Sequence, residues 1–309
     1  MEFSHKPVLL EETIKGLHIK ENGIYIDGTL GGAGHSKQIL KQLSPKGLLI
    51  GIDRDEEALK AARENLKEFS NVKYIHGNHD ELEDILQTIG IDKVDGILLD
   101  LGVSSYQLDE KARGFSYLGN NELDMRMDKT QKLTAKEVIN TYSEETLAQI
   151  IYEYGEERFS RQIAKNICNL RKNKQIETTE ELVNIIEKSI PSFAKKDGHP
   201  AKRTFQAIRI EVNNEIKPIE NTIRTCIKHL KTGGRLCVIT FHSLEDRAVK
   251  NAYIEAEGKC TCPKDLPYCV CGAKSEGKII NKKPIIATEE EQKENSRSKS
   301  AKLRIFEKN

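Results

Sequence analysis

Short apolar runs alternate with longer amphipathic segments through the first hundred residues of the chain. The apolar runs predict buried strands at Gly23–Asp27, Gly47–Asp53, Val72–His76 and Val94–Leu101. Helical spacing of apolar residues predicts helices between them, at His35–Leu43, Asp55–Phe69 and Glu81–Ile89. Nearly continuous apolar strands with intervening helices indicate a parallel sheet that is covered on both faces. We therefore predict an α/β fold with a doubly wound, mostly parallel sheet.

The alternation of apolar runs and amphipathic segments stops after Leu101. A polar loop runs from residue 102 to residue 128, and only helices are expected from there to about residue 196. Thr134 with Glu137, and Thr178 with Glu181, have the spacing of capping boxes at helix starts. The pattern predicts an inserted helical domain at residues 106–199, within a sheet domain formed by residues 1–105 and 200–309.

The last hundred residues return to the first pattern. Amphipathic helices are expected at Thr204–Ile216 and Ile219–Leu230, and strands at Arg235–Phe241 and Leu303–Phe306. The charged tail at Glu289–Lys302 is expected to be loosely ordered before the final strand.

Composition adds limits on the partners. Of the 309 residues 37% are hydrophobic and 31% are charged, but the formal net charge is only +1. Global charge therefore indicates neither nucleic-acid nor membrane binding, and a polyanion would have to meet a local basic patch. The chain has no apolar run of membrane-spanning length and no secretory signal, so we expect a cytoplasmic protein without a membrane partner.

The strongest local signal is the glycine-rich turn from Asp27 to His35, which connects an expected strand to an expected helix. A nicotinamide-binding loop needs G-x-G-x-x-G, and the third glycine would fall on Lys37. An ordinary glycine turn is the alternative to a cofactor loop. Asp53, at the end of the second strand, favours the cofactor, because an acid there can accept both ribose hydroxyls of a nucleoside. Together these residues favour S-adenosylmethionine.

Further candidate residues follow the other expected strands. Asp100 and Gln107 come after the fourth strand, where acceptors could hold an exocyclic amine for methylation. A polar turn with Asp100 as a capping acid is the alternative. His79 follows the third strand and could border a bound adenine, and His242 follows the resumed strand and could contact substrate.

Two sets of residues suggest further partners. Basic residues concentrate in the helical region and just after it, as for a phosphate backbone, or as solvated helix faces paired with Glu: Arg158, Arg161, Lys165, Arg171, Lys172, Lys174, Lys195, Lys196, Lys202, Arg203 and Arg209. Four thiols within twelve positions could hold a structural zinc ion or remain as free or redox-active thiols: Cys260, Cys262, Cys269 and Cys271.

These segments together resemble one family. The residues that carry the resemblance include YIDGTLGGAGHS at 25–36, DGILLDLGVSS at 95–105, LDMRMD at 123–128, HPAKRTFQAIRIEVN at 199–213 and GGRLCVITFHSLEDRAVK at 233–250. They are similar to the MraW family of 16S rRNA cytosine-N4-methyltransferases, also called ribosomal RNA small subunit methyltransferase H. The similarity extends over nearly the whole chain.

The resemblance implies the fold of a class I S-adenosylmethionine-dependent methyltransferase and methyl transfer to a decoding-centre cytidine of 16S rRNA, within the small ribosomal subunit. It assigns the cofactor contacts to Ala33, Gly34, His35, Asp53, His79, Asp100 and Gln107, and Asp27, the acid at the strand end before the loop, is expected to face the methionine amino group. Asp100, Gln107 and His242 are the candidate catalytic residues, and the helical domain would recognise the substrate. A non-catalytic ribosome-assembly factor that keeps the cofactor fold is the main rival. The sequence identifies neither a proton acceptor for the amine nor the oligomeric state.

Overall fold

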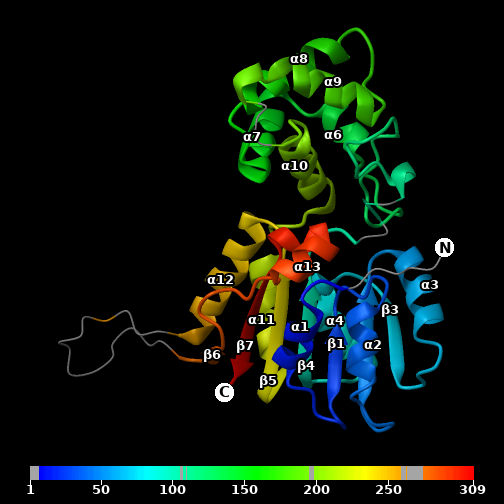
Figure 1. Ribbon diagram of the computed structural model, residues 1–309, viewed down its shortest axis with the longest axis vertical. Helices are drawn as coiled ribbons and strands as arrows, with labels where there is room; N and C mark the ends of the chain where they lie inside the picture. The colour runs from blue at the N-terminus through cyan, green and yellow to red at the C-terminus, as the bar shows by residue number, and fades with distance from the viewer. Residues whose placement is uncertain (1–6, 105–106, 109, 195–197, 259–261, 263–273) are drawn as a thin grey trace. The chain divides into compact units, whose positions relative to one another are not determined.

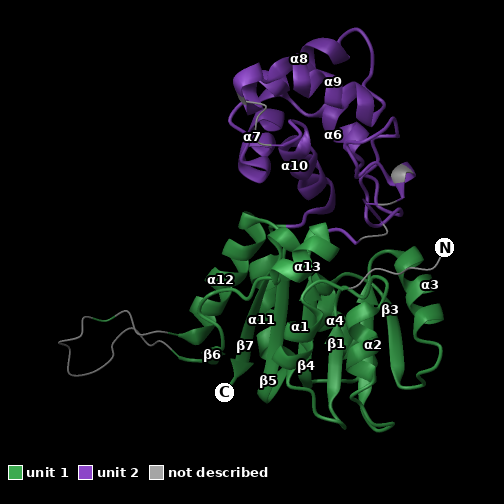
Figure 2. Ribbon diagram, viewed as in Figure 1, with its two compact units in different colours: residues 1–102, 216–309 green, residues 103–215 purple. Residues whose placement is uncertain are grey.

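The computed structural model describes all residues except 1–6, 105–106, 109, 195–197, 259–261 and 263–273. The chain forms two compact units, which we call the sheet unit (residues 1–102 and 216–309) and the helical unit (residues 103–215), coloured separately in Figure 2. No helix in the described part of the chain is long and apolar enough to cross a membrane.

The sheet unit is built from a seven-stranded sheet in the order β3-β2-β1-β4-β5-β7-β6. Its strands are β1 (Ile24–Asp27), β2 (Leu48–Asp53), β3 (Val72–His76), β4 (Val94–Asp100), β5 (Leu230–Thr240), β6 (Gly277–Ile279) and β7 (Lys302–Lys308). Neighbouring strands from β3 to β5 are parallel, whereas β7 runs antiparallel to both β5 and β6. The prediction of a doubly wound, mostly parallel sheet is confirmed.

Helices cover both faces of this sheet (Figure 1). They are α1 (Leu10–Leu17), α2 (Gly34–Leu40), α3 (Glu56–Asn65), α4 (Leu82–Ile89), α11 (Ile219–His229), α12 (Ser243–Glu257) and α13 (Glu289–Glu294), with 3-10 turns η1 (His79–Glu81) and η4 (Ser296–Ser300). Tyr25 and Leu98 join the apolar core on one face, and Ile26, Ile97 and Leu99 join the core on the other. Because the central strands β1 and β4 are buried on both faces, their sequences are nearly continuous apolar runs.

The helical unit has its own apolar core. Its elements are η2 (Lys111–Arg113), α6 (Ala135–Thr141), α7 (Glu144–Gly155), α8 (Ser160–Arg171), α9 (Thr179–Ser189), η3 (Ser192–Ala194) and α10 (Lys202–Asn213). Both predicted capping boxes are present: Thr134 and Glu137 begin α6, and Thr178 and Glu181 begin α9.

The return to the sheet unit lies at residue 216, rather than near residue 200 as the sequence pattern indicated. Phe205, Ile208 and Val212 of α10 are buried in the core of the helical unit, so this helix belongs there. Only Ile216, the last residue of the predicted stripe, packs against the core of the sheet unit. An apolar stripe predicts that a helix buries one face, but it does not say which core receives that face.

The expectation of a loosely ordered tail is wrong. Residues 289–300 form α13 and η4, and Thr288 caps α13 by accepting a hydrogen bond from Glu291 N. The Glu291 carboxylate in turn accepts a hydrogen bond from Leu9 N at 2.8 Å. This long-range contact ties the tail to the start of the chain, and the charge pattern of the tail does not reveal it.

Candidate active site

Three acids end three neighbouring strands of the sheet unit. Asp27, Asp53 and Asp100 are the last residues of β1, β2 and β4, and β1 pairs in parallel with the other two strands. The carboxyl ends of these strands therefore form one edge of the sheet. The strand order reverses between β1 and β4, and open α/β sheets bind ligands outside such a switch point.

The glycine-rich turn begins directly after Asp27. Gly28 N donates to Leu98 O at 2.9 Å, and a Cβ at Gly28 would lie 2.5 Å from Leu99 Cδ2. A Cβ at Gly34, where α2 begins, would lie 2.2 Å from Pro7 Cγ. At both positions only glycine fits, so the turn is pressed tightly against its neighbours. Between them Ala33 is buried and adopts the left-handed conformation, with φ 62°.

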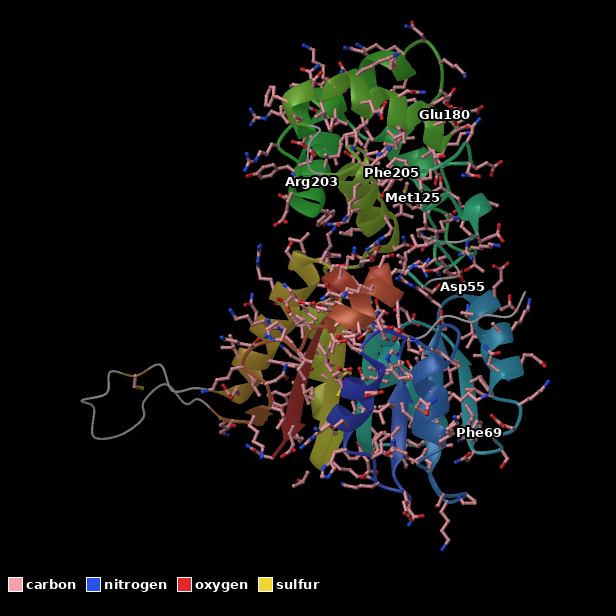
Figure 3. The ribbon with its side chains drawn as sticks, viewed as in Figure 1. Asp55, Phe69, Met125, Glu180, Arg203 and Phe205 are labelled. Carbon is pink, nitrogen blue, oxygen red and sulfur yellow. The ribbon has the colours of Figure 1, made fainter. Side chains whose placement is uncertain are left out.

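Asp53 holds this turn in place. Its Oδ2 accepts a hydrogen bond from Gly31 N at 2.8 Å, and its Oδ1 accepts one from Asp55 N at 2.8 Å. Asp55, labelled in Figure 3, caps the start of α3. Burial raises the pKa of Asp53, while the two backbone hydrogen bonds lower it. Each carboxylate oxygen keeps a lone pair that can accept a ligand hydroxyl.

Asp27 is buried behind the turn. Its Oδ2 accepts a hydrogen bond from Ser36 Oγ at 2.7 Å, and its Oδ1 accepts one from Thr29 N at 3.2 Å. Burial raises the pKa of Asp27 to about 6, in spite of these hydrogen bonds. Thr29 also accepts a hydrogen bond, from Asp100 N to its Oγ1 at 2.6 Å, and so joins the ends of β1 and β4.

Asp100 has an unsatisfied carboxyl. Its Oδ1 is buried and has no hydrogen-bond partner among the described residues. Burial, followed by the negative charges of Asp27 and Glu245, raises the pKa of Asp100 to about 8. A hydrogen-bond donor or a cation beside Oδ1 would satisfy this oxygen and stabilise the ionised form of the carboxyl. Asp100 is therefore the group in this site that most clearly requires a ligand.

Two histidines flank the turn as neutral rings. His35 Nε2 lies 3.0 Å from Val8 O, and burial lowers the pKa of His35 to about 4. The other nitrogen, Nδ1, lies 4.0 Å from Asp100 Oδ2, which is too far for a hydrogen bond. His79 lies beside Gly28, and burial lowers its pKa to about 3. Its Nδ1 is buried and, like Asp100 Oδ1, lacks a partner in the described structure.

His242 caps a helix. Its side chain and that of Glu245 form a capping box at the start of α12, and Glu245 Oε2 accepts hydrogen bonds from Phe241 N and His242 N. His242 Nε2 lies 3.0 Å from Glu245 Oε1 but makes no hydrogen bond. This local role explains the position of His242 without a substrate, and its contact with substrate stays a prediction.

The structure thus brings eight of the predicted residues to one unit: Asp27, Ala33, Gly34, His35, Asp53, His79, Asp100 and His242. Gln107 belongs to the helical unit, where it is buried and its Oε1 accepts a hydrogen bond from Ser104 N at 3.1 Å. Cys260, Cys269 and Cys271 lie outside the described residues, so the zinc hypothesis stays a prediction from spacing.

Sequence reasoning missed three residues of this site. Thr29 and Ser36 bind Asp27 from within the turn and its helix, and Glu245 contributes to the raised pKa of Asp100. Glu245 had a usable signal, because a polar residue followed three positions later by Glu is the pattern of a capping box. The two hydroxyls had no such signal.

Comparison with known proteins identifies the family. The model of the MraW methylase family matches residues 2–309. The chain belongs to this family. The MraW chain described here is 58% identical over 309 residues to the ribosomal RNA small subunit methyltransferase H of Lachnospira eligens, covering 99% of this chain and 98% of that protein.

A second relative extends the similarity. The protein of the same name from Clostridium botulinum (strain Kyoto, type A2) is 57% identical over 308 residues, which cover 100% of both chains. Membership of a methylase family agrees with the mostly parallel, seven-stranded sheet described above. The expected fold class, a class I methyltransferase fold with an inserted helical lobe, is confirmed for this MraW methylase.

Proposed function

We propose that this protein transfers a methyl group from S-adenosylmethionine to the exocyclic N4 amine of a cytidine in the decoding centre of 16S rRNA. The names of the two relatives support an rRNA substrate in the small subunit. The observation that carries the proposal is the buried, unpartnered Oδ1 of Asp100 at the end of β4, beside the glycine-rich turn.

The residues of the sheet unit fit S-adenosylmethionine. Asp53 offers carboxylate lone pairs for two ribose hydroxyls, and the unpartnered Nδ1 of His79 fits a position near the adenine. Asp27 and the backbone from Ala33 to His35 would hold the methionine part. When bound, the cofactor supplies a methyl group on a positively charged sulfonium. That positive charge would stabilise the ionised carboxyl of Asp100, which the negative charges of Asp27 and Glu245 otherwise disfavour.

Asp100 would also bind the substrate amine as a hydrogen-bond acceptor. The lone pair of a cytosine amine is delocalised into the ring, so the amine has to be held by acceptors and aligned with the methyl donor. The Asp100 carboxylate can accept one N–H of the amine, and Gln107 is the second proposed acceptor. The proton released after transfer can pass to water, so this mechanism requires no dedicated base.

The helical unit is the proposed substrate-recognition domain. An amine inside a stacked duplex cannot reach a methyl donor, so the target cytidine has to be unpaired or flipped out. A separate domain that grips the flanking RNA would supply the binding energy for that step. The small ribosomal subunit is the proposed context, and it places the protein in the bacterial cytoplasm.

Incubation with radiolabelled S-adenosylmethionine and undermethylated small subunits tests the proposal. Label in the RNA supports the enzyme, and Asp100→Asn should reduce its rate by at least about 100-fold, because the amide removes the charge and half the acceptor capacity. Tight binding of the subunit without label would instead identify a non-catalytic assembly factor. A control with Asp92→Asn, an exposed acid just before the amino end of β4 and so at the opposite end of that strand from Asp100, should keep full activity.

A structural zinc ion held by Cys260, Cys262, Cys269 and Cys271 is a separate proposal that rests on spacing alone. Metal analysis of protein purified under reducing conditions tests it. One zinc per chain supports the site, and its absence removes the site without affecting the methyltransferase proposal.

A further inference from the structure

One stretch of the helical unit carries only positive charge. Residues 158–176 contain six Lys and Arg residues and no Asp or Glu. Arg171 donates to the carbonyl oxygens of Ile139 and Tyr142, and Lys174 pairs with Glu181. These two cations therefore support the fold, which leaves the exposed cations at the beginning of the stretch to be explained.

Arg158, Arg161 and Lys165 are exposed and form no ion pair with any described residue. Arg161 and Lys165 are four positions apart on α8, so they share one face of the helix. Arg158 lies immediately before Phe159, the residue that caps α8. These three cations are neither buried nor ion-paired within the described structure, so the fold itself does not explain them.

The start of α10 brings two further cations to the same corner. A Cβ at Gly155, the end of α7, would lie 2.6 Å from Arg203 O, and Arg203 donates to Glu156 O at 3.4 Å. Lys202 and Arg203 are both exposed, whereas Phe205 is buried in the core of the unit; Figure 3 labels Arg203 and Phe205. We call Arg158, Arg161, Lys165, Lys202 and Arg203 the basic corner.

An aromatic ring stands at this corner. Phe193 of η3 is 73% exposed, more than any other large apolar residue described. Its ring packs against the ring of Phe159 in a T-shaped contact, with the centroids 6.4 Å apart. Phe159 itself is partly buried against the core of the helical unit, so it holds Phe193 near the residue that follows Arg158. An exposed ring beside unpaired cations offers a ligand an aromatic face for stacking together with positive charge.

We propose that the basic corner and Phe193 together bind an unpaired RNA segment, and this inference rests on the proposed rRNA substrate. Cations match the phosphates, and an exposed aromatic ring stacks on a base whose face is free, which a duplex does not offer. A second copy of this chain is a poor occupant, because the same cations would repel each other. The segment would flank the target cytidine and anchor the RNA to the helical unit.

Binding of a fluorescent single-stranded RNA of about 12 nucleotides to the full chain, measured against salt concentration, tests the surface directly. The triple variant R158A/R161A/K165A should lower the salt slope by about 2 and weaken binding on the order of 100-fold at about 0.1 M salt, since each phosphate contact on a single strand contributes about 0.7 to the slope. The matched control K41A/K46A/K73A removes three exposed lysines of the sheet unit and should bind like the wild type.

Variants of Phe193 distinguish the contribution of stacking to RNA binding from the contribution of charge. Phe193→Ala should weaken RNA binding about tenfold, and Phe193→Trp should retain it. If F193A binds RNA like the wild type while the triple variant loses most of its affinity, the ligand is not recognised by stacking. That result would contradict an unpaired strand and favour another polyanion, such as a duplex or an acidic protein. Equal affinity of the triple variant and its control would overturn the whole surface. Thermal unfolding of each variant checks that the fold is intact.

Methyl transfer to small subunits, measured in parallel, distinguishes this inference from the proposed function. The triple variant should raise KM for the subunit and leave kcat unchanged. If the wild type binds RNA through this surface but transfers no methyl group, the proposed function fails and the surface stands. If methyl transfer is normal in the triple variant and in F193A, the surface fails and the proposed function stands.

Discussion

Asp100 N donates a hydrogen bond to Thr29 Oγ1 at 2.6 Å, which links the end of β4 to the turn that follows β1. The same hydroxyl lies 3.5 Å from Asp27 Oδ1 and can donate to it. Thr29 thus connects the acid behind the glycine-rich turn to the acid with the unsatisfied oxygen. The position of Asp100 depends on a hydroxyl from the turn that follows a neighbouring strand.

Removal of that hydroxyl should damage both stability and activity. Thr29→Val keeps the shape of the side chain but leaves Asp100 N without a partner, which should cost about 1–3 kcal/mol of unfolding free energy. Thr29→Ser keeps the hydroxyl and should stay within about 0.5 kcal/mol of the wild type. Urea denaturation compares the two variants, and equal stability would show that the hydrogen bond contributes nothing.

Asp53 should control cofactor affinity. Asp53→Ala removes the acceptor proposed for the ribose hydroxyls and also frees Gly31 N, so calorimetry should show at least about tenfold weaker binding of S-adenosylmethionine. Asp53→Asn keeps one acceptor oxygen and should fall between the alanine variant and the wild type. Unchanged affinity in D53A would remove Asp53 from the cofactor site.

Two glycines of one turn offer a matched pair. Gly34→Ala places a Cβ 2.2 Å from Pro7 Cγ, whereas a Cβ at Gly32 meets no atom within 4 Å. Overpacking of this kind should destabilise G34A by about 1–3 kcal/mol. Gly32→Ala should change the unfolding free energy by less than about 0.5 kcal/mol. Thermal unfolding measures both, and similar values for the two variants would contradict the tight contact with Pro7.

Asp100 should make the ligand-free protein less stable as the pH rises. Its folded pKa is about 8 and its ordinary value is 3.8, so between these values the folded state holds a proton that the unfolded state has released. The stability that this group contributes is present at low pH and is lost as the pH rises toward about 8. His35 and His79 are neutral in the folded state, but near their ordinary pKa of 6.5 about half of each is protonated in the unfolded state, so they add a slope of opposite sign that fades above about pH 7.5.

Urea denaturation from about pH 6.5 to about pH 8 measures this effect. Relative to Asp100→Asn, which keeps both histidines, the wild type should lose up to about 1.4 kcal/mol per pH unit. Asp27, His35 and Glu245, which surround the carboxyl, are unchanged in the variant. Identical slopes in the wild type and D100N would mean that Asp100 ionises normally in the folded protein.

The sequence predicted most of the sheet because buried parallel strands leave an unmistakable apolar pattern. It placed Asp27, Asp53 and Asp100 at strand ends, and the structure puts all three at one edge. It also predicted the capping boxes of α6 and α9, since these depend on residues only three positions apart. Local patterns with fixed spacing are readable from one sequence.

Features that depend on distant contacts were not predictable in this way. The assignment of α10 to the helical unit depends on which core receives Phe205, and the order of the tail depends on Glu291 reaching Leu9 N. The role of Thr29 depends on the pairing of β1 with β4, which places its hydroxyl beside Asp100 N. Each of these contacts joins residues far apart in the chain, so no local pattern encodes it.

The central claim is the transfer of a methyl group to a cytidine N4 amine. Its most direct test uses S-adenosylmethionine with a deuterated methyl group, undermethylated small subunits, and mass spectrometry of the nucleosides digested from 16S rRNA. The account predicts deuterated N4-methylcytidine, about one per 16S rRNA, with the wild type, and almost none with D100N. Label on cytosine C5, on a ribose hydroxyl or on no nucleoside at all would contradict it.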